Sequence, residues 1–189
     1  MDAAARRATR RSRLVMAVLI AIPLLVLVPA VVRHWLGISL LGATKRGDAT
    51  EVRRLLAMGA DTSIRSTSEI YTPLDALDDL QHGRRNPYRG YSLLMLAAIG
   101  GNEDIVRSLL DHRADVNANT YTNGIGQTAL MLAVTYKRPK VVALLLAHGA
   151  DVRAVDGMSR NAIDLTTESE IARMLQQAGA VRSTPVKGR

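Results

Sequence analysis

The amino-acid sequence predicts an all-α fold, a solenoid of helix-turn-helix units with hairpin loops, preceded by one N-terminal transmembrane helix. Two observations lead to this prediction. First, a frame of apolar residues followed by Gly-Ala or Ala-Asp recurs along the chain, and such self-similarity indicates stacked supersecondary units. Second, the 19 residues from 14 to 32 carry no charge, and a helix of that length nearly matches the roughly 30 Å hydrocarbon core of a bilayer.

The composition limits the classes of function. Hydrophobic residues make up 48% of the chain and charged residues 22%, which is typical of a globular core. Only 3% of the residues are aromatic and none is Phe, so aliphatic and small side chains must fill the core, which favours packed helices. The absence of cysteine excludes disulfides, thiol catalysis and thiolate zinc sites.

The formal net charge of +8 lies mainly at the two ends of the chain. Residues 1–13 carry +4 and residues 181–189 carry +3, which leaves +1 for residues 14–180. A nucleic-acid-binding domain needs its basic residues on the folded part. The sequence therefore predicts no nucleic-acid partner.

The N-terminal region divides into a basic segment, residues 1–13, and a signal-anchor, residues 14–35. Five arginines precede the uncharged run, whereas three basic residues follow it within about 20 residues. This bias predicts a cytoplasmic N-terminus. Trp35 follows the run where an indole prefers the membrane interface. We expect a single-pass protein of a bacterial inner membrane, with its repeats in the periplasm and residues 14–32 in the lipid.

Two other export signals fit the same region. Val28-Pro29-Ala30 offers small residues for signal-peptide cleavage, which would leave the repeats free in the periplasm. Thr9-Arg10-Arg11 is similar to a twin-arginine signal, although Arg13 stands where that signal prefers an apolar residue. The uncharged run is longer than the hydrophobic core of a signal peptide, which is usually about 7–15 residues, and this favours the retained anchor. All three interpretations export the repeats.

Four copies of the repeat frame follow the N-terminal segment. Each copy ends a helix with an apolar pair or triplet, and a residue suited to left-handed backbone follows, as at Gly59 and Gly149. Ser92 and Thr128 open short helices as capping hydroxyls. Each unit is therefore expected to be helix, turn, helix and extended loop. The copies run from 47 to 61, 101 to 118, 137 to 152 and 171 to 180.

On these residues the chain resembles the ankyrin repeat family over about residues 39–180. The specific motifs are the Gly-Ala-Asp turn and the opening Thr-Ala-Leu-Met-Leu-Ala at residues 128–133. The resemblance implies a curved solenoid of antiparallel helix pairs with protruding β-hairpin loops, whose loop tips and concave inner-helix face bind proteins. It implies no enzymatic activity, and with it no catalytic residue, cofactor or small-molecule substrate.

The chain departs from the family pattern at several positions. The usual histidine of the helix opening is replaced in three repeats, by Met95, Met131 and Asp164. A hydrogen bond that the family uses between repeats is therefore lost or altered. Arg113 occupies the position of Gly59 and Gly149, which is unfavourable if the backbone there is left-handed.

An insertion near residues 70–90 separates the first two copies, and its part from Gln81 to Gly90 is rich in turn-forming and basic residues. Long loops on a rigid scaffold are often functional. Tyrosine and arginine are common interface anchors. The alternative is that these side chains are solvent-exposed loop residues that bind no partner. Our partner-binding candidates are Arg84, Arg85, Tyr88 and Arg89 in the insertion, Tyr121 at a hairpin tip, and Tyr136 with Lys137 near an inner-helix end.

The sequence contains no recognisable catalytic, metal-binding or nucleotide-binding motif. His112 and His148 occupy the same turn in successive repeats, and nothing supplies the further ligands that a metal requires. Asp61, Asp115 and Asp151 recur at the repeat period, which indicates a turn-forming role. No nucleophilic triad, phosphate-binding loop or dinucleotide fingerprint is present.

The predicted function is therefore that of a non-catalytic scaffold at the membrane, which binds a protein of unknown identity to stabilise, inhibit or localise it. One specific alternative is an immunity protein that neutralises a toxic effector. Another is an accessory subunit of a periplasmic enzyme, in oxidative-stress defence. Residues 181–189 are expected to form a disordered tail.

Overall fold

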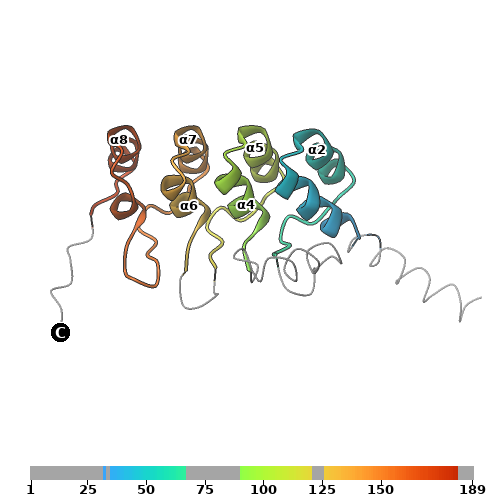
Figure 1. Ribbon diagram of the computed structural model, residues 1–189, viewed down its shortest axis with the longest axis horizontal. Coiled ribbons are helices and arrows are strands. Elements are labelled where there is room, and N and C mark those ends of the chain that lie inside the picture. Colours follow the sequence, from blue (N-terminus) through green and yellow to red (C-terminus); the bar gives the residue numbers. More distant parts are fainter. Residues whose placement is uncertain (1–31, 33–34, 67–89, 121–125, 183–189) are drawn as a thin grey trace, which may run out of the picture.

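The structure, a computed structural model, describes residues 32, 35–66, 90–120 and 126–182. Within these residues the secondary structure consists of helices, turns and two isolated β-bridges, with no strand. Figure 1 shows the helices stacked in pairs along one axis, in chain order from α2 to α8. The predicted all-α solenoid is confirmed for the described part of the chain.

The predicted membrane segment lies outside the described residues, except for Val32. The N-terminal basic segment and residues 183–189 of the predicted tail also lie outside them. Among the residues that are described, no helix combines the length and the apolar character needed to cross a bilayer.

Each unit pairs an inner helix with an outer helix. The inner helices contact one another along the stack, from α4 to α6 to η3, and the outer helices do the same from α2 to α5, α7 and α8. The pairs are the helix over residues 35–46 with α2 (Ala49–Ala57), α4 (Leu93–Gly100) with α5 (Glu103–Asp111), α6 (Ala129–Thr135) with α7 (Pro139–Ala147), and the 3₁₀ helix η3 (Ala162–Leu165) with α8 (Ser169–Gln177).

The helices begin where the sequence supplies a cap. Ser92, Thr128 and Asn161 each accept a hydrogen bond from the backbone N–H three residues later, at the start of α4, α6 and η3. Asn102 caps α5 in the same way. No side chain caps α7, which instead begins with Pro139, whose missing N–H needs no partner at that position.

Two of the three residues that replace the expected histidine form local side-chain hydrogen bonds. The Met95 sulfur accepts the Ser92 N–H at 3.4 Å, and an Asp164 carboxylate oxygen accepts the Asn161 N–H at 3.1 Å. In both repeats the side chain completes a reciprocal capping box, so the altered hydrogen bond secures the start of its own helix. The fourth opening remains a single 3₁₀ turn because the backbone becomes extended at Thr166.

The hydrophobic core runs through the middle of the stack. Six consecutive residues are buried in α4, Leu93 to Ala98, and six in α6, Ala129 to Val134. The outer helices bury one face only, as α7 does with the fully buried Leu145. The inner helices therefore need neighbours on every side, whereas each outer helix leaves one face exposed to solvent.

A left-handed residue ends each outer helix, as the repeat frame predicts. The φ angle is 84° at Gly59, 80° at Gly149 and 88° at Gly179, and Arg113 takes the same conformation at 61°. A Cβ at Gly149 would meet no atom within 4 Å, so the site has room for a side chain. The left-handed backbone that makes Arg113 unfavourable is therefore confirmed.

We expect Arg113→Gly to stabilise the fold by about 0.5–1 kcal/mol. Relief of left-handed strain, about 1–2 kcal/mol, exceeds the entropy that glycine adds to the unfolded chain, about 0.4–1 kcal/mol. The reciprocal variant Gly149→Arg should lose a similar amount. Urea unfolding midpoints of both variants and the wild type measure these changes. A lower midpoint for Arg113→Gly would show that the arginine side chain contributes more than the strain removes.

Candidate functional site

The loops between successive units project from one edge of the stack, on the side away from the outer helices (Figure 1). Each described loop leads from an outer helix to the start of the next inner helix. A single antiparallel bridge closes the first stem between Arg65 and Ser92, and another closes the second between Asn119 and Thr128.

The recurring aspartates form the turns that open the loops. The Oδ1 atoms of Asp61, Asp115 and Asp151 each accept the backbone N–H two residues later, at 2.8, 3.0 and 2.8 Å. This geometry is an Asx-turn. The predicted turn-forming role of these three carboxylates is confirmed.

Side chains connect the loop of one unit to the next unit. The Arg65 guanidinium donates from one nitrogen to the Asn119 carbonyl at 2.7 Å and to the Gly90 carbonyl at 3.2 Å. Asn117 accepts the Asp151 N–H at 2.8 Å and donates to the Gly149 carbonyl at 3.4 Å. The first loop is thereby joined to the second, and the second to the third.

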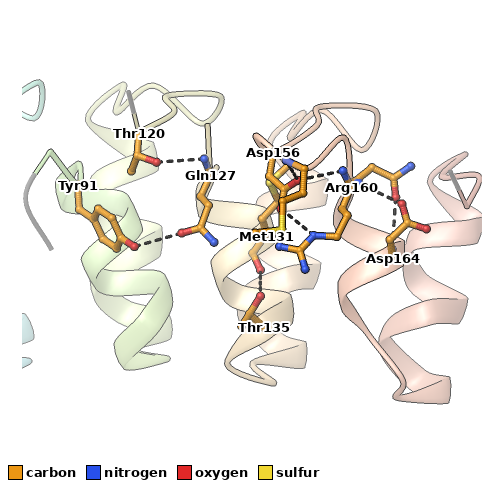
Figure 2. A network of polar contacts seen from close by, with 10 residues as sticks. Tyr91, Thr120, Gln127, Met131, Thr135, Asp156, Arg160 and Asp164 are labelled. Atoms are coloured by element: carbon orange, nitrogen blue, oxygen red, sulfur yellow. Dashed lines mark hydrogen bonds and ion pairs between the residues drawn. The ribbon is translucent and has the colours of Figure 1, made fainter. Parts of the chain in front are cut away.

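Tyr91, Gln127 and Thr120 form a second connection at the base of the loops, shown in Figure 2. The Tyr91 hydroxyl donates to the Gln127 side-chain carbonyl at 3.1 Å. The Gln127 N–H donates to the Thr120 hydroxyl, and the Thr120 N–H donates to the Gln127 carbonyl, both at 3.0 Å. Residues on either side of the second loop are therefore joined to each other and to the start of α4.

The third described loop, residues 151–161, is organised by Asp156, whose side chain is completely buried. Its carboxylate accepts the N–H groups of Met158 and Arg160 at 2.9 Å and two bonds from the Arg160 guanidinium at 2.7 and 3.0 Å (Figure 2). Burial raises the pKa of Asp156, but the hydrogen bonds and charge of Arg160 outweigh burial and hold it below its usual range. Residues 156–160 of this loop therefore form a ring of hydrogen bonds around one carboxylate.

Two large apolar side chains in this loop are exposed to solvent. Val155 is 53% exposed and Met158 is 64% exposed, beside an aspartate that Arg160 neutralises. Sequence reasoning did not select them. The signal that points to them is the Asp156-Gly157 dipeptide, which marks a turn and places its two apolar flanks at an exposed tip.

Five of the predicted binding residues, Arg84, Arg85, Tyr88, Arg89 and Tyr121, lie outside the described residues. The ends of their segments do lie within them. Ser66 donates to Tyr91 and accepts from Gly90, so the chain leaves for the insertion and returns from it at one stem. The segment with Tyr121 leaves and returns at the second stem, between Thr120 and residue 126. Because Arg65 bonds to both stems, the two segments start from one place on the loop edge.

The other two candidates lie elsewhere. Tyr136 is the C-cap of α6 and is 44% exposed, and Lys137 follows it with a φ of 55°. The Lys137 ammonium lies 3.1 Å from a Glu168 carboxylate oxygen, which links the third unit to the fourth. Because α6 begins at its loop stem and spans seven residues, Tyr136 is about 10 Å from that stem. The structure therefore separates these residues from the loop edge.

The histidines hold the ends of outer helices. The Nδ1 atom of His112 lies 2.8 Å from the Ser108 carbonyl oxygen, and that of His148 lies 2.8 Å from the Leu144 carbonyl oxygen. A carbonyl can only accept, so each Nδ1 donates. The equivalent placement predicted for these residues is confirmed. In the part of the chain that the structure describes, no three His, Asp or Glu side chains are grouped to hold a metal ion.

Comparison with known proteins matches the chain to one family. The model for ankyrin repeats, in three copies, matches residues 40–156, more than half of the chain. A putative ankyrin repeat-containing protein of Treponema pallidum (strain Nichols) is 34% identical over 120 residues. The match covers 64% of this chain and 33% of that protein, so the chain spans about a third of that relative. The match to the family model ends before η3 and α8, which the structure adds as a fourth pair.

We expect Asp156→Asn to lower stability at pH 7 by about 1–3 kcal/mol, because it weakens charge-assisted bonds to a buried acceptor. A carboxyl with a lowered folded pKa stabilises fully above its unfolded pKa, about 3.9, and loses that contribution as the pH falls through the folded value. The gap between wild type and variant should therefore narrow below about pH 4.

Urea unfolding at pH 7 and at about pH 3 measures both effects. Asp151→Asn is the matched control, because its exposed oxygen accepts one backbone N–H that an amide oxygen also accepts. Equal losses for the two variants at pH 7 would show that the Arg160 pair contributes nothing.

Proposed function

This chain belongs to the ankyrin repeat family, and from that premise we propose that it is a non-catalytic scaffold that binds a partner protein through its loop edge. The observation that carries the proposal is the bracing of successive loops by Arg65, Asn117 and Tyr91. A surface that is ordered before binding loses less entropy on binding, so more of the contact energy becomes affinity.

The binding residues that we propose are Arg84, Arg85, Tyr88 and Arg89, together with Tyr121. Their support is the position of the two stems: the insertion ends at Gly90, the segment with Tyr121 begins just after Asn119, and the carbonyls of Gly90 and Asn119 accept from the same Arg65 guanidinium nitrogen. Both segments can therefore reach a single partner. The arginines place +3 in ten residues, from 81 to 90, without an acidic neighbour, so the partner surface that fits them is acidic.

Tyr136 and Lys137 are the second proposed site. They lie at the opposite end of α6 from the loops, where Tyr136 is exposed. A partner bound there would cover the turns between inner and outer helices. The two sites are far enough apart to be tested independently.

We further propose that residues 14–32 hold the scaffold in a bacterial inner membrane, with residues 1–13 in the cytoplasm and the repeats in the periplasm. The support is the uncharged run and the five arginines before it. If the run is cleaved as a signal peptide, the repeats remain in the periplasm without a tether.

Replacing Arg84, Arg85 and Tyr88 together by alanine should weaken partner capture at least tenfold, about 1.4 kcal/mol. The thermal transition should hardly move, because the residues from Gln81 to Gly90 are rich in turn-forming and basic side chains and the sequence predicts an exposed loop there. The measurement is affinity capture from membranes followed by titration of the identified partner. Tyr136→Ala with Lys137→Ala tests the second proposed site, at the other end of α6, in the same assay. Loss of binding in this second variant alone would move the binding site from the loop edge to Tyr136 and Lys137.

The identity of the captured partner also decides between the finer functions. A toxic effector whose activity falls on binding supports an immunity role. An oxidoreductase that is stabilised by binding supports an accessory role in oxidative-stress defence. Capture of nucleic acid instead of protein would overturn the proposal.

A reporter enzyme fused after Arg189 should be active only if it works in the periplasm, because the positive-inside bias places the chain end there. Protease added to spheroplasts should then digest the repeats. Protection of residues 39–180 in intact spheroplasts, together with a reporter active only in the cytoplasm, would overturn the proposed topology.

A further inference from the structure

The two ends of the solenoid differ in the side chains they offer to solvent. A terminal repeat has a neighbour on one side only and needs a polar outer surface to remain soluble. The C-terminal helix α8 meets this requirement, since it exposes Glu170, Arg173, Gln176 and Gln177. The N-terminal helix over residues 35–46 has no charged residue before Lys45.

The first turn of the N-terminal helix carries Trp35, the only tryptophan of the chain, with 71% of its surface exposed. Tryptophan is highly buried on average in folded proteins, so this exposure is unusual. Ile38 and Gly42 follow at spacings of three and seven residues, on the same face, and both are partly exposed. Among the described residues, this face of the N-terminal helix therefore carries an indole at one end, no charge from Trp35 to Gly42, and the Arg46 guanidinium beside Gly42 at its other end.

The position of Trp35 in the chain indicates what covers this face. Val32, the last residue of the uncharged run, is helical and 50% exposed, and it lies three residues before Trp35. Three residues span about 4.5 Å in a helix and at most about 11 Å when extended. The polar layer on each side of a bilayer is about 5–8 Å thick. If the run spans the membrane, Trp35 must therefore lie in this layer or at its edge.

We infer that the face of Trp35, Ile38 and Gly42 is a contact surface for the bilayer interface, so that the first unit rests on the lipid headgroups. The inference rests on the proposed tether. An indole is favoured there because its ring is apolar while its N–H remains hydrated. The stack then extends from the membrane toward α8, and the loop edge is presented beside it rather than against the lipid (Figure 1).

The single tryptophan makes this contact measurable in the full, unmodified chain. The chain is reconstituted in vesicles of phosphatidylcholine and phosphatidylglycerol, and tryptophan emission is recorded with two quenchers. One is iodide in the water, and the other is phosphatidylcholine brominated near the carbonyl end of its acyl chain. We expect iodide quenching about threefold weaker than for a free tryptophan amide, together with strong quenching by the brominated lipid.

The matched control moves the tryptophan to the far end of the solenoid. In Trp35→Phe with Met158→Trp, the indole replaces a residue that is 64% exposed on the loop around Asp156. This indole should be fully open to iodide and unaffected by the brominated lipid. Equal lipid quenching at both positions would overturn the inference, because the solenoid would then lie flat on the membrane.

Three other outcomes also decide whether Trp35 contacts the bilayer interface. If the chain floats with the vesicles while Trp35 stays fully open to iodide, the contact is wrong and the tether stands. If the chain does not float with the vesicles, the tether fails and the contact fails with it. If Trp35 is protected from iodide only at high protein-to-lipid ratio, a second copy covers the face and the inference is overturned.

Discussion

The structure depends on the packing of two inner helices that have no polar face. Six consecutive residues are buried in α4 and six in α6, so neither helix is stable without α5 and α7 on one side and the adjacent inner helices along the stack. Alanines such as Ala97 and Ala133 allow this close approach. A solenoid built in this way is stabilised by its nearest-neighbour interfaces, and its two ends are the places where that stabilisation is incomplete.

Because the inner helices are held on all sides, their first residues are fixed in space, and the loops start from fixed points. Polar contacts then organise the loops locally: an Asx-turn opens three of them, and Arg65 and Tyr91 join neighbouring stems. The core therefore determines where the loop edge lies, and hydrogen bonds determine its shape. This division is suited to recognition, since loop side chains can vary without disturbing the packing beneath them.

The two ends of the stack expose different kinds of side chain. At the C-terminal end, η3 and α8 close the core with a polar helix, and Lys137 links this last pair to the third unit through Glu168. At the N-terminal end the first helix has no charged residue before Lys45 and carries an exposed indole three residues after the uncharged run. An exposed apolar surface of this kind marks an interaction site. Because Trp35 follows the uncharged run closely, the surface that we propose it contacts is the bilayer interface.

The sequence by itself determined the repeat frame, the caps at Ser92 and Thr128, the turn-forming aspartates and the left-handed position of Arg113, because all of these depend on residues within one or two turns of each other. It could also select Tyr136 and Lys137 as exposed, because they follow the apolar run of α6. Only the tertiary structure decided that Arg65 joins two loop stems 54 residues apart in one bond, that Asp156 is buried within a ring that exposes Val155 and Met158, and that Tyr136 lies away from the loop edge. These features depend on the distance between units, which packing of the inner helices sets and local sequence patterns do not encode.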